Sequence, residues 1–187
     1  MSGRILAGVA AAVLALSSGA AAAEPMFGIG TDVGVPDGAT ASLVVRPVRA
    51  LRLHVGGSHN YVSPGVRAGV TLVPFASWFS PTLSFDAGRY TEGDANPLAR
   101  MITGDRSFQA RVLERVGYDY VNAHGGLELG RKRFTFYIHA GMSRVTTEVH
   151  ELGVSADENR AGVTFVDDPR VTLWSVSARA GLILYVK

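Results

Sequence analysis

The chain has 187 residues, 18 of them basic and 16 acidic, and it contains no cysteine. A formal charge of +2 does not suggest nucleic-acid binding, and the lack of cysteine excludes both a disulfide framework and a lipid-modified N-terminal cysteine. All basic residues except Lys132 and Lys187 are arginine, which suits bidentate pairing with carboxylates or phosphates.

Residues 1–23 have the features of a secretory signal peptide. Arg4 precedes an apolar run that ends at Leu16, and small residues then lead to an Ala21-Ala22-Ala23 cleavage site. An uncleaved membrane anchor is the alternative, because the whole segment is about long enough to span a bilayer. Its apolar centre is short, which favours cleavage. Residues 24–187 are then expected to form one domain.

Beyond this segment, apolar side chains alternate with polar or small ones in eight stretches. In the clearest of them, Leu51 and Leu53 fall on one face while Arg52 and His54 fall on the other. Such alternation, separated by turn signals such as Pro36-Asp37-Gly38, is typical of strands with two unlike faces. The eight stretches are 26–35, 39–47, 51–58, 66–73, 82–88, 121–129, 134–143 and 171–186. They predict an all-β protein, an eight-stranded antiparallel up-and-down barrel.

The lengths of the connections support a transmembrane barrel. The even-numbered connections, 47–50, 74–81 and 130–133, are short, whereas the two longest, 91–119 and 148–170, are odd-numbered. In an outer-membrane barrel with both ends on the periplasmic side, the odd-numbered connections lie outside the cell and are the long ones.

The apolar face determines whether the barrel is a soluble, lipocalin-like cup or a membrane cylinder. A cup has its apolar face inside, whereas a membrane barrel has it outside, against lipid. Strand cores of about 9–11 residues and glycine-rich polar faces favour the membrane barrel. Two groups of aromatic residues are expected to form interfacial girdles: Phe75, Trp78 and Phe79 at one end, and Tyr61, Tyr90, Tyr118, Tyr120 and Trp174 at the other.

Residues 24–187 resemble the small eight-stranded outer-membrane barrels of Gram-negative bacteria, the group that includes the OmpA transmembrane domain and OmpX. In the last strand, Arg179, Gly181, Leu184 and Val186 have the spacing of the assembly signal of that class, although Lys187 ends the chain where an aromatic residue is usual. The resemblance implies export, insertion into the outer membrane by the barrel-assembly machinery, and a monomer in contact with outer-membrane lipid and lipopolysaccharide.

An outward apolar face would direct ten titratable side chains into the lumen. They are Asp32, Arg46, Arg52, His54, Arg67, Asp86, His124, Glu128, His139 and Arg179. Eight strands leave a lumen just wide enough for side chains to fill, and charges enclosed there must be paired. We therefore predict a plugged lumen, with a narrow pore as the alternative.

Two contacts in the lumen are predicted from strand pairing. The first and last strands close the barrel, so Asp32 and Arg179 are expected to pair or to share a partner. About a turn at Arg131-Lys132, His124 would lie directly opposite His139, with Cβ atoms about 4.5–5.5 Å apart. Such a pair could bind a metal or act as a pH switch, but no third ligand is evident. We expect neutral, hydrogen-bonded histidines and no metal or cofactor.

The two long connections differ in charge. Arg89 stands at the edge of 91–119, and the connection carries Arg100, Arg106, Arg111 and Arg115; the segment 107–116 is expected to be a short amphipathic helix or a strand extension. The connection 148–170 carries Glu148, Glu151, Asp157, Glu158, Asp167 and Asp168. The loops could clamp together, or could bind lipopolysaccharide phosphates and a divalent cation. Solvated loops are the simplest interpretation.

The sequence contains no convincing hydrolytic site. A nucleophile, a base and an acid must lie within hydrogen-bond reach. Ser58 and His59 are adjacent and face opposite sides, and Ser143 lies about 13 Å along its strand from His139. We therefore expect an outer-membrane barrel with an envelope-structural or surface-interaction role and no enzymatic activity. A narrow pore is the second interpretation, and a lipid hydrolase the third.

Overall fold

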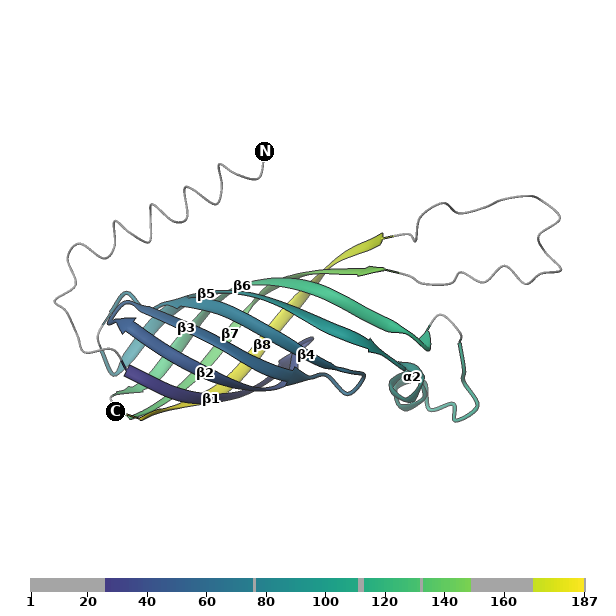
Figure 1. Ribbon diagram of the computed structural model, residues 1–187, viewed down its shortest axis with the longest axis horizontal. Coiled ribbons are helices and arrows are strands. Elements are labelled where there is room, and N and C mark those ends of the chain that lie inside the picture. Colours follow the sequence, from purple (N-terminus) through teal and green to yellow (C-terminus); the bar gives the residue numbers. More distant parts are fainter. Residues whose placement is uncertain (1–25, 76, 111–112, 132, 149–169, 187) are drawn as a thin grey trace.

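The chain folds into a closed barrel in which consecutive strands pair antiparallel and β8 pairs with β1 (Figure 1). The computed structural model describes residues 26–75, 77–110, 113–131, 133–148 and 170–186. It confirms the predicted all-β fold and the eight-stranded antiparallel barrel. The predicted signal peptide lies outside the described residues. No described helix is long and apolar enough to cross a membrane.

The strands of the first half match their predicted bounds to within about two residues, whereas those of the second half are mostly longer than predicted. The strands are β1 (Met26–Val35), β2 (Gly38–Val48), β3 (Leu51–His59), β4 (Pro64–Leu72), β5 (Phe79–Gly93), β6 (Val116–Arg131), β7 (Phe134–Glu148) and β8 (Arg170–Val186). As a result, β5–β8 continue beyond the ends of β1–β4 on the side where the helix lies (Figure 1).

A single described helix, α2 (Asn96–Thr103), lies within the predicted connection 91–119. Pro97 fits its first turn, where a proline costs no hydrogen bond, and Gly104 ends it in a left-handed conformation with φ of 72°. Of the segment 107–116, predicted as a short helix or a strand extension, residues 111 and 112 lie outside the described residues, and none of the others belongs to an α-helix. The other predicted possibility, a strand extension, holds only from Val116 onward.

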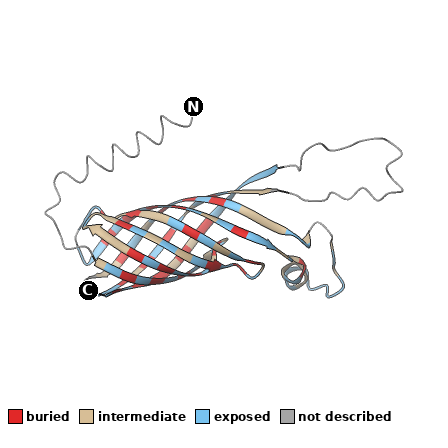
Figure 2. Ribbon diagram, in the orientation of Figure 1, coloured by how far each residue is buried: buried red, intermediate tan, exposed pale blue. Residues whose placement is uncertain are grey.

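Burial alternates residue by residue along the strands (Figure 2). In β1, Phe27, Ile29 and Val33 are 56–63% exposed, whereas Asp32 is only 2% exposed. The apolar face therefore points outward and the polar face into the lumen, which is the orientation that the strand lengths and the glycine-rich polar faces favoured. This arrangement is the reverse of a water-soluble core.

The register between β6 and β7 differs from the prediction. Arg131 pairs with Phe134, so the turn is one residue further along than expected, and His139 lies opposite Gly126 instead of His124. The predicted direct histidine pair was wrong because the position of the turn determines every pairing along the hairpin. The two rings remain neighbours, with centroids 6.4 Å apart.

Glycines make room for these histidines in the barrel wall. Gly141 lies opposite His124, and a Cβ atom added to Gly141 would overlap the carbonyl oxygen of Ala123. Gly125, on the adjacent strand, faces outward, and a Cβ atom there would meet nothing within 4 Å. The side-chain position of Gly141 is therefore taken up by neighbouring backbone, whereas that of Gly125 is open.

We predict that Gly141→Val destabilises the barrel and that Gly125→Val does not. An inward valine must displace backbone, and overpacking of this kind costs about 1–3 kcal/mol or more. The folded fraction after refolding into detergent, measured by circular dichroism and by an unheated gel, should fall sharply for Gly141→Val alone. Equal yields for the two variants would contradict the described register.

Candidate functional site

Nine of the ten side chains predicted to face the lumen do so. Asp32, Arg52, Arg67, Asp86, His124, Glu128, His139 and Arg179 are at most 5% exposed, and the side chain of His54 is 8% exposed. Arg46 is the exception, since its Nε donates to the carbonyl oxygen of Arg49 at 3.0 Å at the end of the barrel. A register irregularity between Val45 and Val48 interrupts the alternation there.

Asp86 is the centre of the largest cluster in the lumen. Its Oδ1 lies 2.5 Å from Nε2 of His54, and its Oδ2 accepts hydrogen bonds from Arg179 at 2.7 Å and from Ser84 at 3.2 Å. Arg179 also donates to Nδ1 of His139 at 3.4 Å. One carboxylate therefore joins β3, β5 and β8 through charge-assisted hydrogen bonds.

A second cluster is built around Arg67. Its guanidinium forms an ion pair with Asp32 and lies 3.5 Å from Oδ2 of Asp37. The hydroxyl of Tyr137 donates to Asp32 at 2.8 Å, and the amide of Asn122 donates to Asp37 at 2.9 Å. Together these residues anchor β4 to β1 and to the β1–β2 turn.

Asp37 belongs to the lumen although the sequence indicated only a turn residue. It is 1% exposed, because the β1–β2 turn folds inward over the end of the lumen. Burial raises the pKa of its carboxyl, even though Arg67 and the amide of Asn122 oppose the rise. No periodicity could identify Asp37, because it lies between two strands.

Arg52 and Glu128 form a third buried ion pair. The guanidinium of Arg52 also lies 5.5 Å from the centre of the Tyr137 ring, within the range of a cation–π contact. Tyr137 therefore contacts both this pair and the Asp32 cluster. It is 6% exposed and was not among the predicted lumen residues.

The predicted direct pair between Asp32 and Arg179 does not form. Asp32 contacts Arg67 and Tyr137, whereas Arg179 contacts Asp86, Ser84 and His139, so the two have no shared hydrogen-bond partner among the described residues. Side chains in so narrow a lumen meet across it. The ion-pair partners of both residues therefore lie on non-adjacent strands, Arg67 on β4 for Asp32 and Asp86 on β5 for Arg179.

Three tyrosines that were predicted for the outer girdle point inward. Tyr90 and Tyr120 are each 2% exposed, and Tyr118 is partly buried. The centroid of the Tyr90 ring lies 4.9 Å from that of Tyr118 and 5.8 Å from that of Tyr120. Alternation could have placed them, because Tyr90 has the same parity as Asp86. The remaining predicted girdle residues, Phe75, Trp78, Phe79, Tyr61 and Trp174, are 50–81% exposed.

Side chains nearly fill the interior between the clusters. The internal cavity there has a volume of about 10 Å³ and is lined by Arg52, His54, Arg67, His139 and Arg179 among others. Such a space holds about one water molecule. The described residues therefore enclose a plugged lumen at this level.

Ser177, His124 and Asp86 lie in the order of a hydrolase triad, a juxtaposition that was not predicted. Nε2 of His124 is 2.9 Å from Oγ of Ser177, but Nδ1 is 3.7 Å from Asp86, too long for a hydrogen bond. All three are at most 2% exposed, and Ser177 does not line the internal cavity. The trio thus packs the lumen. The serines that the sequence raised, Ser58 and Ser143, are also buried.

The described residues contain no group of three His, Cys, Asp or Glu side chains that could hold a metal ion. In the connection after β5, Arg115 pairs with Glu92 at 2.7 Å. Residues 149–169, which include most of the predicted acidic loop, and Arg111 lie outside the described residues. The clamp between the loops therefore stays a prediction.

The last strand presents its predicted assembly signal on two faces. Leu184 and Val186 point outward and are 53% and 56% exposed, whereas Arg179 points inward and Gly181 packs against Asp32 and Tyr137. Recognition of these residues by the assembly machinery stays a prediction. Comparison of the chain with known protein families, curated proteins and solved structures gave no match.

We predict that Asp86→Asn is far more destabilising than Asp119→Asn. Both aspartates pair with arginine, but Asp86 is buried, whereas Asp119 is about half exposed on the outer surface. Breaking a buried pair costs about 3–5 kcal/mol, and breaking an exposed one about 1 kcal/mol or less. Urea unfolding in detergent micelles, followed by tryptophan fluorescence, measures both changes. Similar midpoints would show that the lumen network does not stabilise the barrel.

Proposed function

We propose that the chain is an integral outer-membrane β-barrel with an envelope-structural or surface-interaction role and a lumen closed by its own side chains. The observation that carries this proposal is the reversed burial. Large apolar side chains cover the outside, and eight of the ten predicted lumen residues, all titratable, are buried inside. Water would penalise such a surface, whereas hydrocarbon stabilises it. Closure of the barrel also leaves no strand edge unpaired along the shared length of β1 and β8.

The height of the apolar surface matches a bilayer. On β7 the outward positions from Phe134 to Met142 are apolar or small, and the first charge is Arg144, ten positions after Phe134. At about 3.3 Å per residue and a tilt of about 40°, ten positions correspond to about 25 Å, the height of the apolar band of outer-membrane barrels. On β5 the same interval separates Phe79 from Arg89.

A structural or surface role fits the interior better than a pore does. The three clusters around Asp86, Arg67 and Arg52 occupy the lumen, and the cavity among them has room for about one water molecule. A steady ion path would require these buried pairs to separate, and each separation leaves charges without partners.

We predict that the chain, expressed in a Gram-negative host, is recovered in the outer-membrane fraction and migrates differently on gels before and after heating. The apolar belt requires lipid, and a closed barrel resists detergent until it is heated. A variant without residues 2–23 serves as a control and should stay in the cytoplasm. Recovery of the exported protein in the soluble periplasm would refute the proposal.

We also predict no discrete conductance from the purified barrel in a planar bilayer. The filled lumen blocks ions, so traces should match those of the lipid alone, while a porin inserted under the same conditions gives steps. Reproducible openings that change in size on Arg52→Ser would instead favour the pore.

A further inference from the structure

Three arginines and one aspartate stand on the outer surface just above the apolar band. They are Arg89 on β5, Asp119 on β6, Arg144 on β7 and Arg170 on β8, and all four are exposed. Arg89 is held by Asp119 through two hydrogen bonds of 2.5 and 2.7 Å. The group carries a net positive charge, which attracts anions.

Arg144 has no hydrogen-bond or ion-pair partner in the part of the chain that the structure describes. It lies opposite Val121 on β6 and Trp174 on β8, which are 57% and 68% exposed. A lipid-facing arginine is costly at the middle of a bilayer and nearly without cost at its surface. At the top of the apolar band its long side chain can extend its guanidinium to the head groups.

This charge is confined to one side of the barrel. None of the exposed residues of β1, β2, β3 and β4 is Asp, Glu, Lys or Arg. The arginines therefore lie only on the part of the barrel's outer rim that β5–β8 form, and they do not form a ring around the whole barrel.

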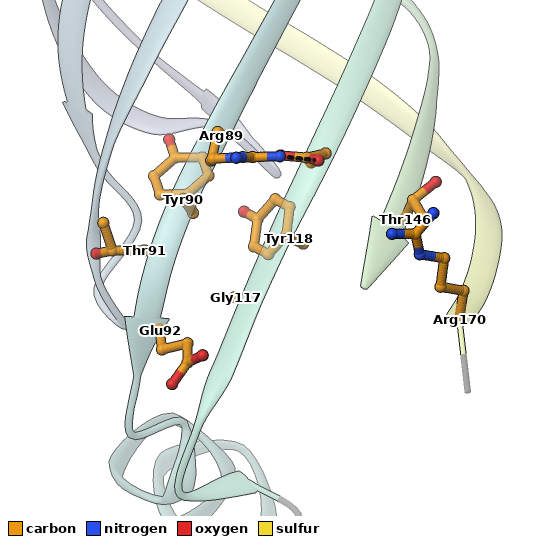
Figure 3. A pocket seen from close by; sticks show the side chains of 9 residues that line it. Arg89, Tyr90, Thr91, Glu92, Gly117, Tyr118, Thr146 and Arg170 are labelled. Atoms are coloured by element: carbon orange, nitrogen blue, oxygen red, sulfur yellow. Dashed lines mark hydrogen bonds and ion pairs between the residues drawn. The ribbon is translucent and has the colours of Figure 1, made fainter. Parts of the chain in front are cut away.

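A pocket of about 840 Å³, a size typical of ligand sites, is lined by three of these four charged residues, Arg89, Asp119 and Arg170, whereas Arg144 lies outside its lining (Figure 3). The rest of its lining is Thr91, Glu92, Gly117 and Thr146, together with the inward-pointing Tyr90 and Tyr118. Gly117 has no side chain to fill the space over β6. Figure 3 shows Arg89 on one side of the strand that carries Gly117, and Thr146 and Arg170 on the other.

We propose that this rim binds a phosphorylated glycolipid of the outer leaflet, of the lipopolysaccharide type, with Arg144 contacting its phosphate. Guanidinium groups bind phosphate with two parallel hydrogen bonds, and the apolar Val121 and Trp174 flank Arg144 where a sugar or an acyl chain would lie. These apolar flanks distinguish a lipid from a free phosphate ion. The inference rests on the proposed membrane location and assigns that location a specific lipid contact.

Lipopolysaccharide binding to purified protein in detergent tests the inference. The chain has two tryptophans, so Trp78→Phe leaves Trp174 beside the site as the only tryptophan, which can be excited selectively. Titration with lipopolysaccharide should shift its emission to shorter wavelength. Adding Arg144→Gln should weaken binding by about tenfold, because a charge-assisted contact with phosphate is lost.

Arg133→Gln is the matched control, since Arg133 is also exposed but lies at the β6–β7 turn, at the opposite end of the barrel. Unchanged binding by Arg133→Gln, with weakened binding by Arg144→Gln, supports the site. Equal binding by both variants overturns it, as does displacement of the lipid by inorganic phosphate at matched phosphate concentration. Membrane fractionation of each variant separates the two proposals, because loss of this site leaves insertion intact.

Discussion

Charges inside the barrel are enclosed by its wall, and each is tolerated only with a partner. Three of the four buried arginine–carboxylate pairs among the described residues join strands that are three apart: β1 with β4, β3 with β6, and β5 with β8; the fourth joins Arg67 on β4 to Asp37 in the β1–β2 turn. These pairs link parts of the wall that share no backbone hydrogen bonds. The network therefore complements the antiparallel ladder, which connects only neighbouring strands.

The sequence predictions that succeeded are those that did not depend on contacts across the lumen. Alternation depends on one strand at a time, so it identified all eight strands and correctly placed nine of the ten lumen residues. The same rule places Tyr90 inside, where it packs against Tyr118. The aromatic residues had instead been assigned to the girdles from their position near the ends of the barrel. That error came from applying the girdle pattern without the parity of the strand.

Partners inside the lumen could not be predicted in the same way. Which residues meet across a barrel depends on the accumulated register of all the hairpins between them, and a turn misplaced by one residue moves every pairing by two. For this reason His124 lies opposite Gly141 and not opposite His139, as had been predicted. Asp37 had no signal at all, because its burial comes from a turn that folds inward onto Asn122 and Arg67.

The same constraint separates what the inside and the outside of the barrel can do. Each buried arginine of the lumen pairs with a carboxylate, and the cavity among these pairs has room for about one water molecule, so the lumen presents little space and no unpaired cation to a ligand. On the outer surface, a charge can do without a paired partner only beyond the apolar band. At that level β5–β8 extend past the ends of β1–β4. Charges without buried partners, such as Arg144, are stable at that level because they lie at the head groups. Specific recognition by this fold is therefore expected on the rim of β5–β8, and the filled lumen serves to hold that rim in place.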